Sequence, residues 1–168
     1  MTEGEKKGSW NKEQLFCSDK HDWGTPLPLF QEVNKEFSFT LDAAASAHNA
    51  KCESYITKEE DALSVDWVEK AKGGAVWLNP PYGRTIGAWL QKAYETSKAG
   101  TPVVCLTFLR SDTTWFHAWA LKAAEIRIIP GRITFDGAKA GAPAPSCLIV
   151  FDENLRIPRF VTQKLPRK

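Results

Sequence analysis

A short apolar run that ends in two consecutive prolines constrains the fold more than any other feature of this sequence. Residues 75–78, Ala-Val-Trp-Leu, are followed directly by Asn79-Pro80-Pro81-Tyr82. A run of this length is typical of a strand buried on both faces, and a proline cannot donate the backbone hydrogen bond that would continue strand pairing. The sequence therefore predicts a core strand that stops abruptly at Asn79, with an aromatic ring beside the stop.

The length and composition of the chain predict a single globular domain. The chain has 168 residues, of which 43% are hydrophobic and 25% charged, and 22 basic residues face 20 acidic ones. This charge balance neither requires nor excludes a nucleic-acid partner. The four cysteines lie far apart without a C-x-x-C pair, so we expect no metal site, free thiols and a cytoplasmic location. No segment is apolar enough to span a membrane, so no membrane partner is expected.

Three parts of the chain are expected to differ in order. Residues 1–12 are polar and charged and predict a disordered tail. Residues 13–152 predict the single folded domain. Residues 153–168 form a basic C-terminal extension, which either follows a nucleic-acid backbone or is an ordinary solvated terminus.

Helix and strand patterns alternate along the domain. Thr25 and Pro26 predict the N-cap and first residue of a helix, and the alternation of Phe37, Phe39 and Leu41 predicts a strand ending at Asp42. The segment 43–70 has no clear pattern. The remaining predicted elements are a strand at 74–79, a helix at 85–100, a strand at 102–109, a helix at 112–124 with Asp112 as its N-cap, two short strands around Pro130-Gly131, and a last strand at 145–151.

This order predicts an α/β fold with a mostly parallel central sheet, helices on both faces and an antiparallel hairpin at one edge. Ligands of such sheets bind outside the carboxyl ends of the strands. We therefore expect Asp42, Asn79 and the loop 109–112 to line one cleft.

The residues after the core strand suit a specific chemical task. The amide oxygen of Asn79 and the carbonyl of Pro80 are two rigidly held acceptors that can bind both protons of one NH₂ group, and Tyr82 offers a flat face for a planar ring. The exocyclic amine of adenine is a poor nucleophile because its lone pair is delocalised. Accepting hydrogen bonds from both of its protons localises that lone pair, so that the nitrogen can attack an electrophilic methyl group in line.

The motif and its surroundings resemble a known family. Asn79-Pro80-Pro81-Tyr82 matches the Asp/Asn-Pro-Pro-Tyr/Phe signature of amino-methyltransferases, and the wider pattern resembles the phage-type, Dam-like DNA N6-adenine methyltransferases. The matching pieces lie between Trp23 and Phe151: "WGTPLPLFQEVNKEFSFTLDAAAS", "YITKEEDALSVDW", "VWLNPPYGR", "LRSDTTWFH", "GRITF" and "APSCLIVF". The resemblance implies a Rossmann-like fold, S-adenosylmethionine as donor with S-adenosylhomocysteine as product, no metal, and double-stranded DNA from which the target adenine is flipped out.

The resemblance also assigns roles to individual residues. The catalytic set is Asn79, Pro80, Pro81 and Tyr82, and Asn79 also borders the donor. Trp23, Thr25 and Pro26 are expected at the methionine end of the donor, Asp42 and Ala43 at the start of its binding loop, and Asp61, Ala62 and Leu63 around its adenine. Asn49 is a candidate for the ribose, with Glu53 as the other. The loop reads "DAAAS" where the family usually has Gly-x-Gly.

The DNA-facing residues implied by the resemblance are Tyr82, Arg84, Arg110, Ser111, Asp112 and Arg132. The motifs fill nearly the whole chain, which leaves no room for a separate target-recognition domain. Sequence reading is therefore expected from the loops 110–114 and 136–145 or from a second subunit, so an oligomer is among the expectations.

Three other functions remain open from the sequence. A glutamine-amide protein methyltransferase poses the same chemical problem at its target nitrogen. Methylation of cytosine N4 or of RNA adenine is a closer variant. A catalytically silent relative that binds nucleic acid as a partner subunit is a different class altogether.

Overall fold

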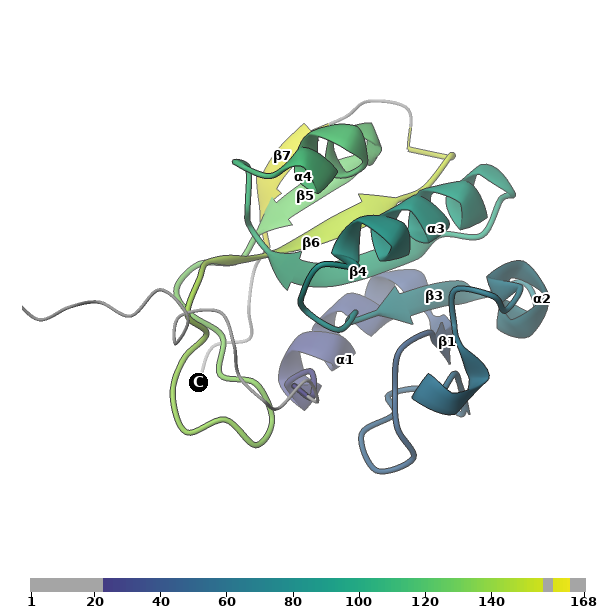
Figure 1. Ribbon diagram of the computed structural model, residues 1–168, viewed down its shortest axis with the longest axis horizontal. Coiled ribbons are helices and arrows are strands. Elements are labelled where there is room, and N and C mark those ends of the chain that lie inside the picture. The colour runs from purple at the N-terminus through teal and green to yellow at the C-terminus, as the bar shows by residue number, and fades with distance from the viewer. Residues whose placement is uncertain (1–22, 156–158, 164–168) are drawn as a thin grey trace, which may run out of the picture.

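A seven-stranded sheet with helices on both faces forms the fold (Figure 1). The computed structural model describes residues 23–155 and 159–163, so the predicted tail at 1–12 lies outside the described residues. The strands lie in the order β2-β1-β3-β4-β6-β5-β7. The predicted mixed α/β architecture is confirmed.

The helices and strands have the following bounds. The helices are α1 (Leu27–Phe37), α2 (Trp67–Ala71), α3 (Ile86–Lys98) and α4 (Thr114–Ala118), with short 3₁₀ turns η1 (Lys58–Glu60) and η2 (Ala120–Lys122). The strands are β1 (Phe39–Asp42), β2 (Ser54–Tyr55), β3 (Ala75–Leu78), β4 (Val103–Phe108), β5 (Glu125–Ile128), β6 (Ser146–Phe151) and β7 (Arg159–Thr162).

Most strand pairs in the sheet are parallel, as predicted. β1 pairs in parallel with β2 and β3, β3 with β4, and β5 with β7. Only β6 runs the other way, antiparallel to both β4 and β5. The predicted antiparallel hairpin therefore exists as β5 and β6, but it does not form the edge because β7 lies outside it.

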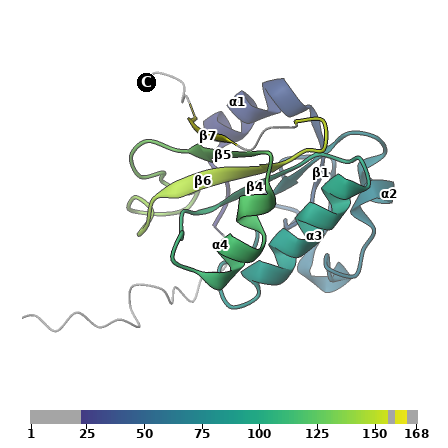
Figure 2. The ribbon, with the colours of Figure 1, turned by 90° about the horizontal axis from the view of Figure 1, so that it is seen from above.

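The core strand β3 is buried on both faces, which explains its continuous apolar sequence. Ala75 and Trp77 pack in the cluster on the α1 side, whereas Val76 and Leu78 pack in the cluster that contains α3. Figure 2 shows α1 on one side of the sheet and α3 and α4 on the other. The helices on both faces of the sheet are thus confirmed.

The start of α1 differs from the sequence prediction. The helix begins at Leu27 with Pro26 at the N-cap, one residue later than predicted, and no side chain caps it. Thr25 is not the cap because its hydroxyl is buried and accepts a hydrogen bond from the indole nitrogen of Trp77 at 3.3 Å. Phe37 closes the helix and Ser38 turns the chain with φ of 53°, so the strand starts only at Phe39.

Two further elements differ from the sequence prediction. The helix after β4 begins at Thr114 rather than at Asp112, whose carboxylate pairs with Arg110 instead of capping the helix. The second short strand expected after Pro130-Gly131 is absent from the described residues. Residues 132–135 are irregular there, because Ile133 and Phe135 are buried in the core rather than paired in a ladder.

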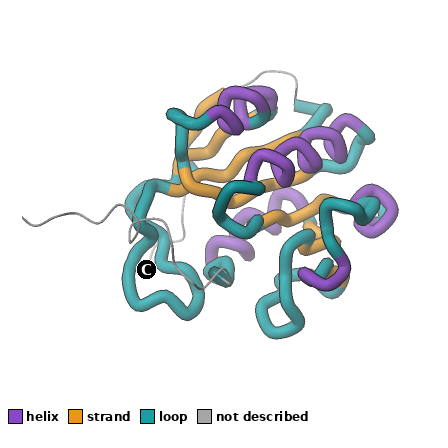
Figure 3. The backbone as a smooth tube through the Cα atoms, in the orientation of Figure 1, coloured by secondary structure: helices purple, strands orange, loops and turns teal. Residues whose placement is uncertain are grey.

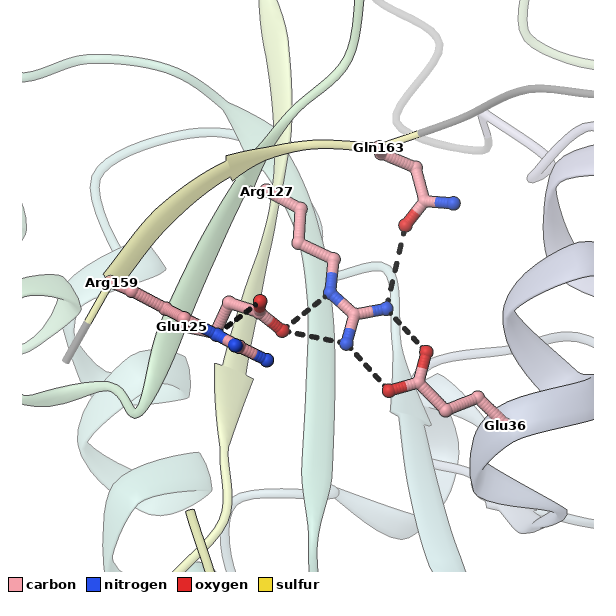
Figure 4. Close-up of polar contacts among 5 residues, drawn as sticks. All are labelled: Glu36, Glu125, Arg127, Arg159 and Gln163. Carbon is pink, nitrogen blue, oxygen red and sulfur yellow. Dashed lines mark hydrogen bonds and ion pairs between the residues drawn. The ribbon is translucent and has the colours of Figure 1, made fainter. Parts of the chain in front are cut away.

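Strand β7 lies in the segment that the sequence analysis describes only as a basic extension. It is fixed to the body by a partly buried ion-pair network (Figure 4). The guanidinium of Arg127 on β5 contacts Glu125 at 2.6 Å and Glu36 of α1 at 2.6 Å, and Arg159 of β7 contacts Glu125 at 2.9 Å. Gln163 also approaches Arg127, at 3.5 Å. The network joins α1, β5 and β7.

Gly74, just before β3, provides a test of this packing. A Cβ built there would lie 2.2 Å from Cγ2 of Thr40 on β1, whereas a Cβ at Gly87 in α3 meets its nearest atom at an ordinary 3.5 Å. We expect Gly74→Ala to lower the free energy of unfolding by about 2–3 kcal/mol. Gly87→Ala should raise it by about 0.5 kcal/mol, because alanine favours a helix. Urea unfolding measures both, and a harmless Gly74→Ala would contradict this packing.

Candidate active site

The carboxyl ends of three neighbouring strands meet at one edge of the sheet. Asp42, the last residue of β1, pairs with Trp77, and Leu78 of β3 pairs with Cys105 of β4. Asn79 follows β3 directly, and the loop 109–112 follows β4. The three strand ends therefore lie at one edge of the sheet. That they line one cleft stays a prediction.

Asn79 is held by two hydrogen bonds that fix its amide. Its Nδ2 donates to the backbone carbonyl of Trp23 at 2.6 Å, and its Oδ1 accepts from the hydroxyl of Tyr82 at 3.2 Å. The first contact requires the segment before α1 to cross the end of β3. An amide oxygen has two lone pairs, so Oδ1 retains capacity for one further donor. Within the described part of the chain, the carbonyl of Pro80 accepts no backbone hydrogen bond.

An aromatic cluster supports Tyr82. Its ring stacks on Phe108 with centroids 4.4 Å apart, and Phe135 meets it edge-on at 6.0 Å. Burial raises the pKa of Tyr82 well above its ordinary value, so its hydroxyl stays protonated and remains a donor to Asn79. One face of Tyr82 is therefore covered by Phe108, a residue that is not among the predicted site residues. Its place at the end of β4, the parallel neighbour of β3, is the signal that could have identified it.

Asp42 organises the loop that follows β1. Its side chain is 3% exposed, and its carboxylate accepts hydrogen bonds from the backbone N–H of Lys51 at 3.0 Å and of Ala44 at 3.4 Å. Burial raises the pKa of Asp42, while these hydrogen bonds act in the opposite direction. Ala43 is buried beside it and donates its N–H to the carbonyl of Trp77. A direct contact between Asp42 and a donor stays a prediction.

A pocket of about 370 Å³ opens where three loops meet. The loops are the segment before α1, the segment after β1 and the long connection between β5 and β6; the last two are drawn as loops in Figure 3. The lining residues are Trp23, Gly24, His48, Asn49, Lys51, Asp136 and Gly137. Trp23 and Asn49 belong to the predicted donor set. Lys51 and Asp136 do not, and no local pattern marks them.

Of the other predicted donor residues near α1, Pro26 is partly buried, and the hydroxyl of Thr25 accepts a hydrogen bond from Trp77.

The residues 61–63, predicted to surround the adenine of the donor, make contacts outside the pocket. Asp61 is exposed with φ of 51°, the carbonyl of Ala62 accepts from the indole of Trp67, and that of Leu63 accepts from Lys92. None of the three lines the pocket. Their contact with the donor adenine stays a prediction.

The loop after β4 is stabilised by its own contacts. Arg110 donates to Asp112 at 3.1 Å, and the imidazole Nε2 of His117 in α4 lies 2.8 Å from the carbonyl of Ser111. Arg84 and Arg132 are exposed. The roles of these residues toward DNA stay predictions.

The described residues contain neither a metal-type cluster nor a membrane-spanning helix. Among residues 23–155 and 159–163, no three His, Cys, Asp or Glu side chains gather as a metal centre would require. Within the same residues, every helix is too short or too polar to cross a lipid bilayer.

Comparison with known proteins gives consistent matches. The sequence model of the family described as DNA N-6-adenine-methyltransferase (Dam) matches residues 12–166. The chain is 32% identical over 149 residues to the DNA N-6-adenine-methyltransferase of Haemophilus phage HP1 (strain HP1c1), covering 84% of each protein. It is 33% identical over 115 residues to the DNA N-6-adenine-methyltransferase of Escherichia phage T1, covering 68% of this chain and 47% of that protein.

Proposed function

The chain belongs to the DNA N-6-adenine-methyltransferase (Dam) family, and from this premise we propose that it methylates the N6 amine of adenine in double-stranded DNA. The donor is S-adenosylmethionine, which supplies an electrophilic methyl group on a sulfonium. The target adenine is flipped out of the duplex, because a stacked base cannot reach a recessed motif. The resemblance on which this function first rested is confirmed at the level of the family.

The proposed donor site is the pocket beside Asn79. We propose that the mostly parallel sheet is of the Rossmann-like type, in which ligands bind beyond the carboxyl ends of parallel strands. The pocket of about 370 Å³ lies at that edge, and its wall residue Trp23 also binds Asn79. Trp23 and Asn49 would hold the donor there, while Asp42 and Ala43 shape the loop around it.

The motif would activate the target amine by accepting hydrogen bonds from it. Asn79 Oδ1 and the Pro80 carbonyl each accept a hydrogen bond from one N6–H, which localises the lone pair on nitrogen. The amine then attacks the methyl carbon, the carbon–sulfur bond breaks, and its electron pair stays on sulfur to give S-adenosylhomocysteine. The extra N6 proton leaves to water. Tyr82 stacks against the base with the ring face opposite Phe108, and its hydroxyl keeps the Asn79 amide in orientation.

One observation carries this mechanism: the Asn79 amide is fixed with its nitrogen on Trp23 and its oxygen available to donors. The reversed amide would present N–H groups to the substrate amine and repel it. Because the Trp23 carbonyl can only accept a hydrogen bond, the amide nitrogen must face it, and the amide oxygen then faces the Tyr82 hydroxyl.

The DNA side of the proposal rests on exposed basic residues near the motif. Arg84 follows the motif in sequence, and Arg132 lies in the loop between β5 and β6; both are exposed. We propose that they contact phosphates together with Arg110, and that the loops 110–114 and 136–145 read sequence. The protein would act in the cytoplasm of a bacterial host, as a monomer or with a second subunit.

Labelled donor tests the proposed function directly. Purified protein is incubated with labelled S-adenosylmethionine and unmethylated duplex DNA, and in parallel reactions with RNA or with a protein extract. The DNA is then digested to nucleosides. We expect label on N6-methyladenine. Label on N4-methylcytosine, on RNA or on protein glutamine would replace the proposal by the corresponding alternative, and donor binding without transfer to any of them would indicate a silent partner subunit.

Substitutions at Tyr82 separate its two contacts. Tyr82→Ala removes the ring on which the target adenine is proposed to stack, so we expect the KM for DNA to rise by about ten-fold or more. Tyr82→Phe keeps the stack and loses only the hydrogen bond to Asn79, which should cost about two- to ten-fold in kcat. Steady-state kinetics with duplex DNA measures both. Equal losses of kcat/KM in the two variants would show that stacking on the base is not the role of this ring.

A further inference from the structure

A lysine and an aspartate from distant segments form an ion pair in the wall of the pocket. Lys51 Nζ lies 3.1 Å from Asp136 Oδ2. The lysine side chain is only 12% exposed, whereas the aspartate side chain is 53% exposed. Both residues line the pocket. A largely buried ammonium is costly unless it is paired, so Asp136 stabilises the positive charge of Lys51 in the pocket wall.

The backbone fixes both charges in place. The N–H of Lys51 donates to the buried Asp42 carboxylate at 3.0 Å. The N–H of Asp136 donates to the carbonyl of Gly24 at 2.8 Å, and a Cβ at Gly24 would lie only 3.0 Å from that of Asp136. A glycine at position 24 therefore lets these two segments approach each other closely. The charged pair is held by main-chain contacts on both sides.

The same wall also holds the reactive motif. Trp23, next to Gly24, accepts the 2.6 Å hydrogen bond from Asn79 and lines the pocket beside Lys51. A ligand that reaches from Lys51 toward Trp23 therefore extends toward Asn79. The pair stands at the pocket and not on a remote surface.

We propose that Lys51 and Asp136 bind the zwitterionic amino-acid end of the donor, an inference that rests on the proposed function. The ammonium of Lys51 donates to the ligand carboxylate, and the carboxylate of Asp136 accepts from the ligand ammonium. The Lys51–Asp136 pair, which has no net charge, thus binds a group without net charge, and the largely buried ammonium of Lys51 keeps an opposite partner. Without ligand, the two side chains neutralise each other.

Calorimetry with two related nucleosides tests this clamp. S-adenosylhomocysteine carries the amino-acid end, whereas 5′-methylthioadenosine has the same nucleoside thioether without it. We expect Lys51→Met and Asp136→Asn each to weaken S-adenosylhomocysteine by about 10- to 100-fold. The affinity for 5′-methylthioadenosine should stay within about two-fold of the wild type, because none of the lost contacts involves that ligand.

The control is Lys98→Met, which removes a lysine from an exposed ion pair with Glu153 and should change neither affinity. Asparagine has nearly the same shape as aspartate, and position 136 is half exposed, so Asp136→Asn should fold. It therefore tests the clamp even if circular dichroism shows that Lys51→Met does not fold. Unchanged S-adenosylhomocysteine binding, or equal losses for both nucleosides, would overturn the clamp alone. A wild-type protein that binds neither nucleoside would overturn the proposed donor together with the clamp.

Discussion

Replacing Asn79 by alanine is expected to reduce kcat for DNA methylation by at least about a thousand-fold, because a preorganised polar group aimed at the reacting atom is a large contribution to catalysis. The substitution removes the only side-chain acceptor of the motif that faces the target amine in the proposed mechanism. The Pro80 carbonyl alone would bind one of the two N6 protons and leave the lone pair delocalised. Single-turnover methylation of an unmethylated duplex measures the loss.

The matched measurement is binding of S-adenosylhomocysteine. Asn79→Ala also removes the hydrogen bond to Trp23, a residue of the pocket wall, so we expect a loss of donor affinity below about ten-fold. Asn79→Asp is the control that restores an acceptor oxygen, and it should recover part of the activity despite losing the donor to Trp23. Strong residual turnover of Asn79→Ala would remove the amide from the mechanism.

Replacing Arg127 by methionine is expected to lower the free energy of unfolding by about 3–5 kcal/mol. Figure 4 shows why: one guanidinium serves both Glu125 and Glu36. Glu125 is 2% exposed, so its carboxylate would remain buried, with Arg159 as its one charged partner among the residues that the structure describes. Strand β7 should loosen first, since it joins the body through this network and β5. Urea unfolding and protease sensitivity near residue 159 measure the two effects.

The same network predicts a pH dependence. Hydrogen bonds from Arg127 hold the pKa of Glu36 below its ordinary value, against the opposite effect of partial burial. A lowered carboxyl pKa in the folded state contributes stability above the unfolded pKa, and this contribution is lost as the pH falls from about 5 to 3. Wild-type protein should therefore lose more stability over this range than Arg127→Met.

Lys98→Met is a suitable control for stability as well. Its ion pair with Glu153 is about half exposed at both side chains, and such pairs contribute less than about 1 kcal/mol. A loss for Arg127→Met no larger than for Lys98→Met would mean that the network does not hold β7 and α1 in place.

Patterns between near neighbours in sequence allowed much of the fold to be predicted. The apolar run 75–78 and its two prolines predict a core strand and its end, because burial on both faces requires an uninterrupted apolar sequence. The spacing of apolar residues in α3 similarly predicts that helix. The sequence predictions were wrong where one side chain could make either of two contacts. Thr25 could cap α1 or bind Trp77, and only the packing of β3 against α1 decided between them.

The sequence by itself determined the motif Asn79-Pro80-Pro81-Tyr82, its place after a core strand and the family to which the chain belongs. Only the tertiary structure decided which side chains surround it. Trp23 reaches Asn79 from 56 positions away, and Lys51 meets Asp136 across 85 positions. Periodicity reports which face of an element is buried but not which loops cross its end. Strand order and connection paths bring these residues together, so their partnership exists only in the folded chain.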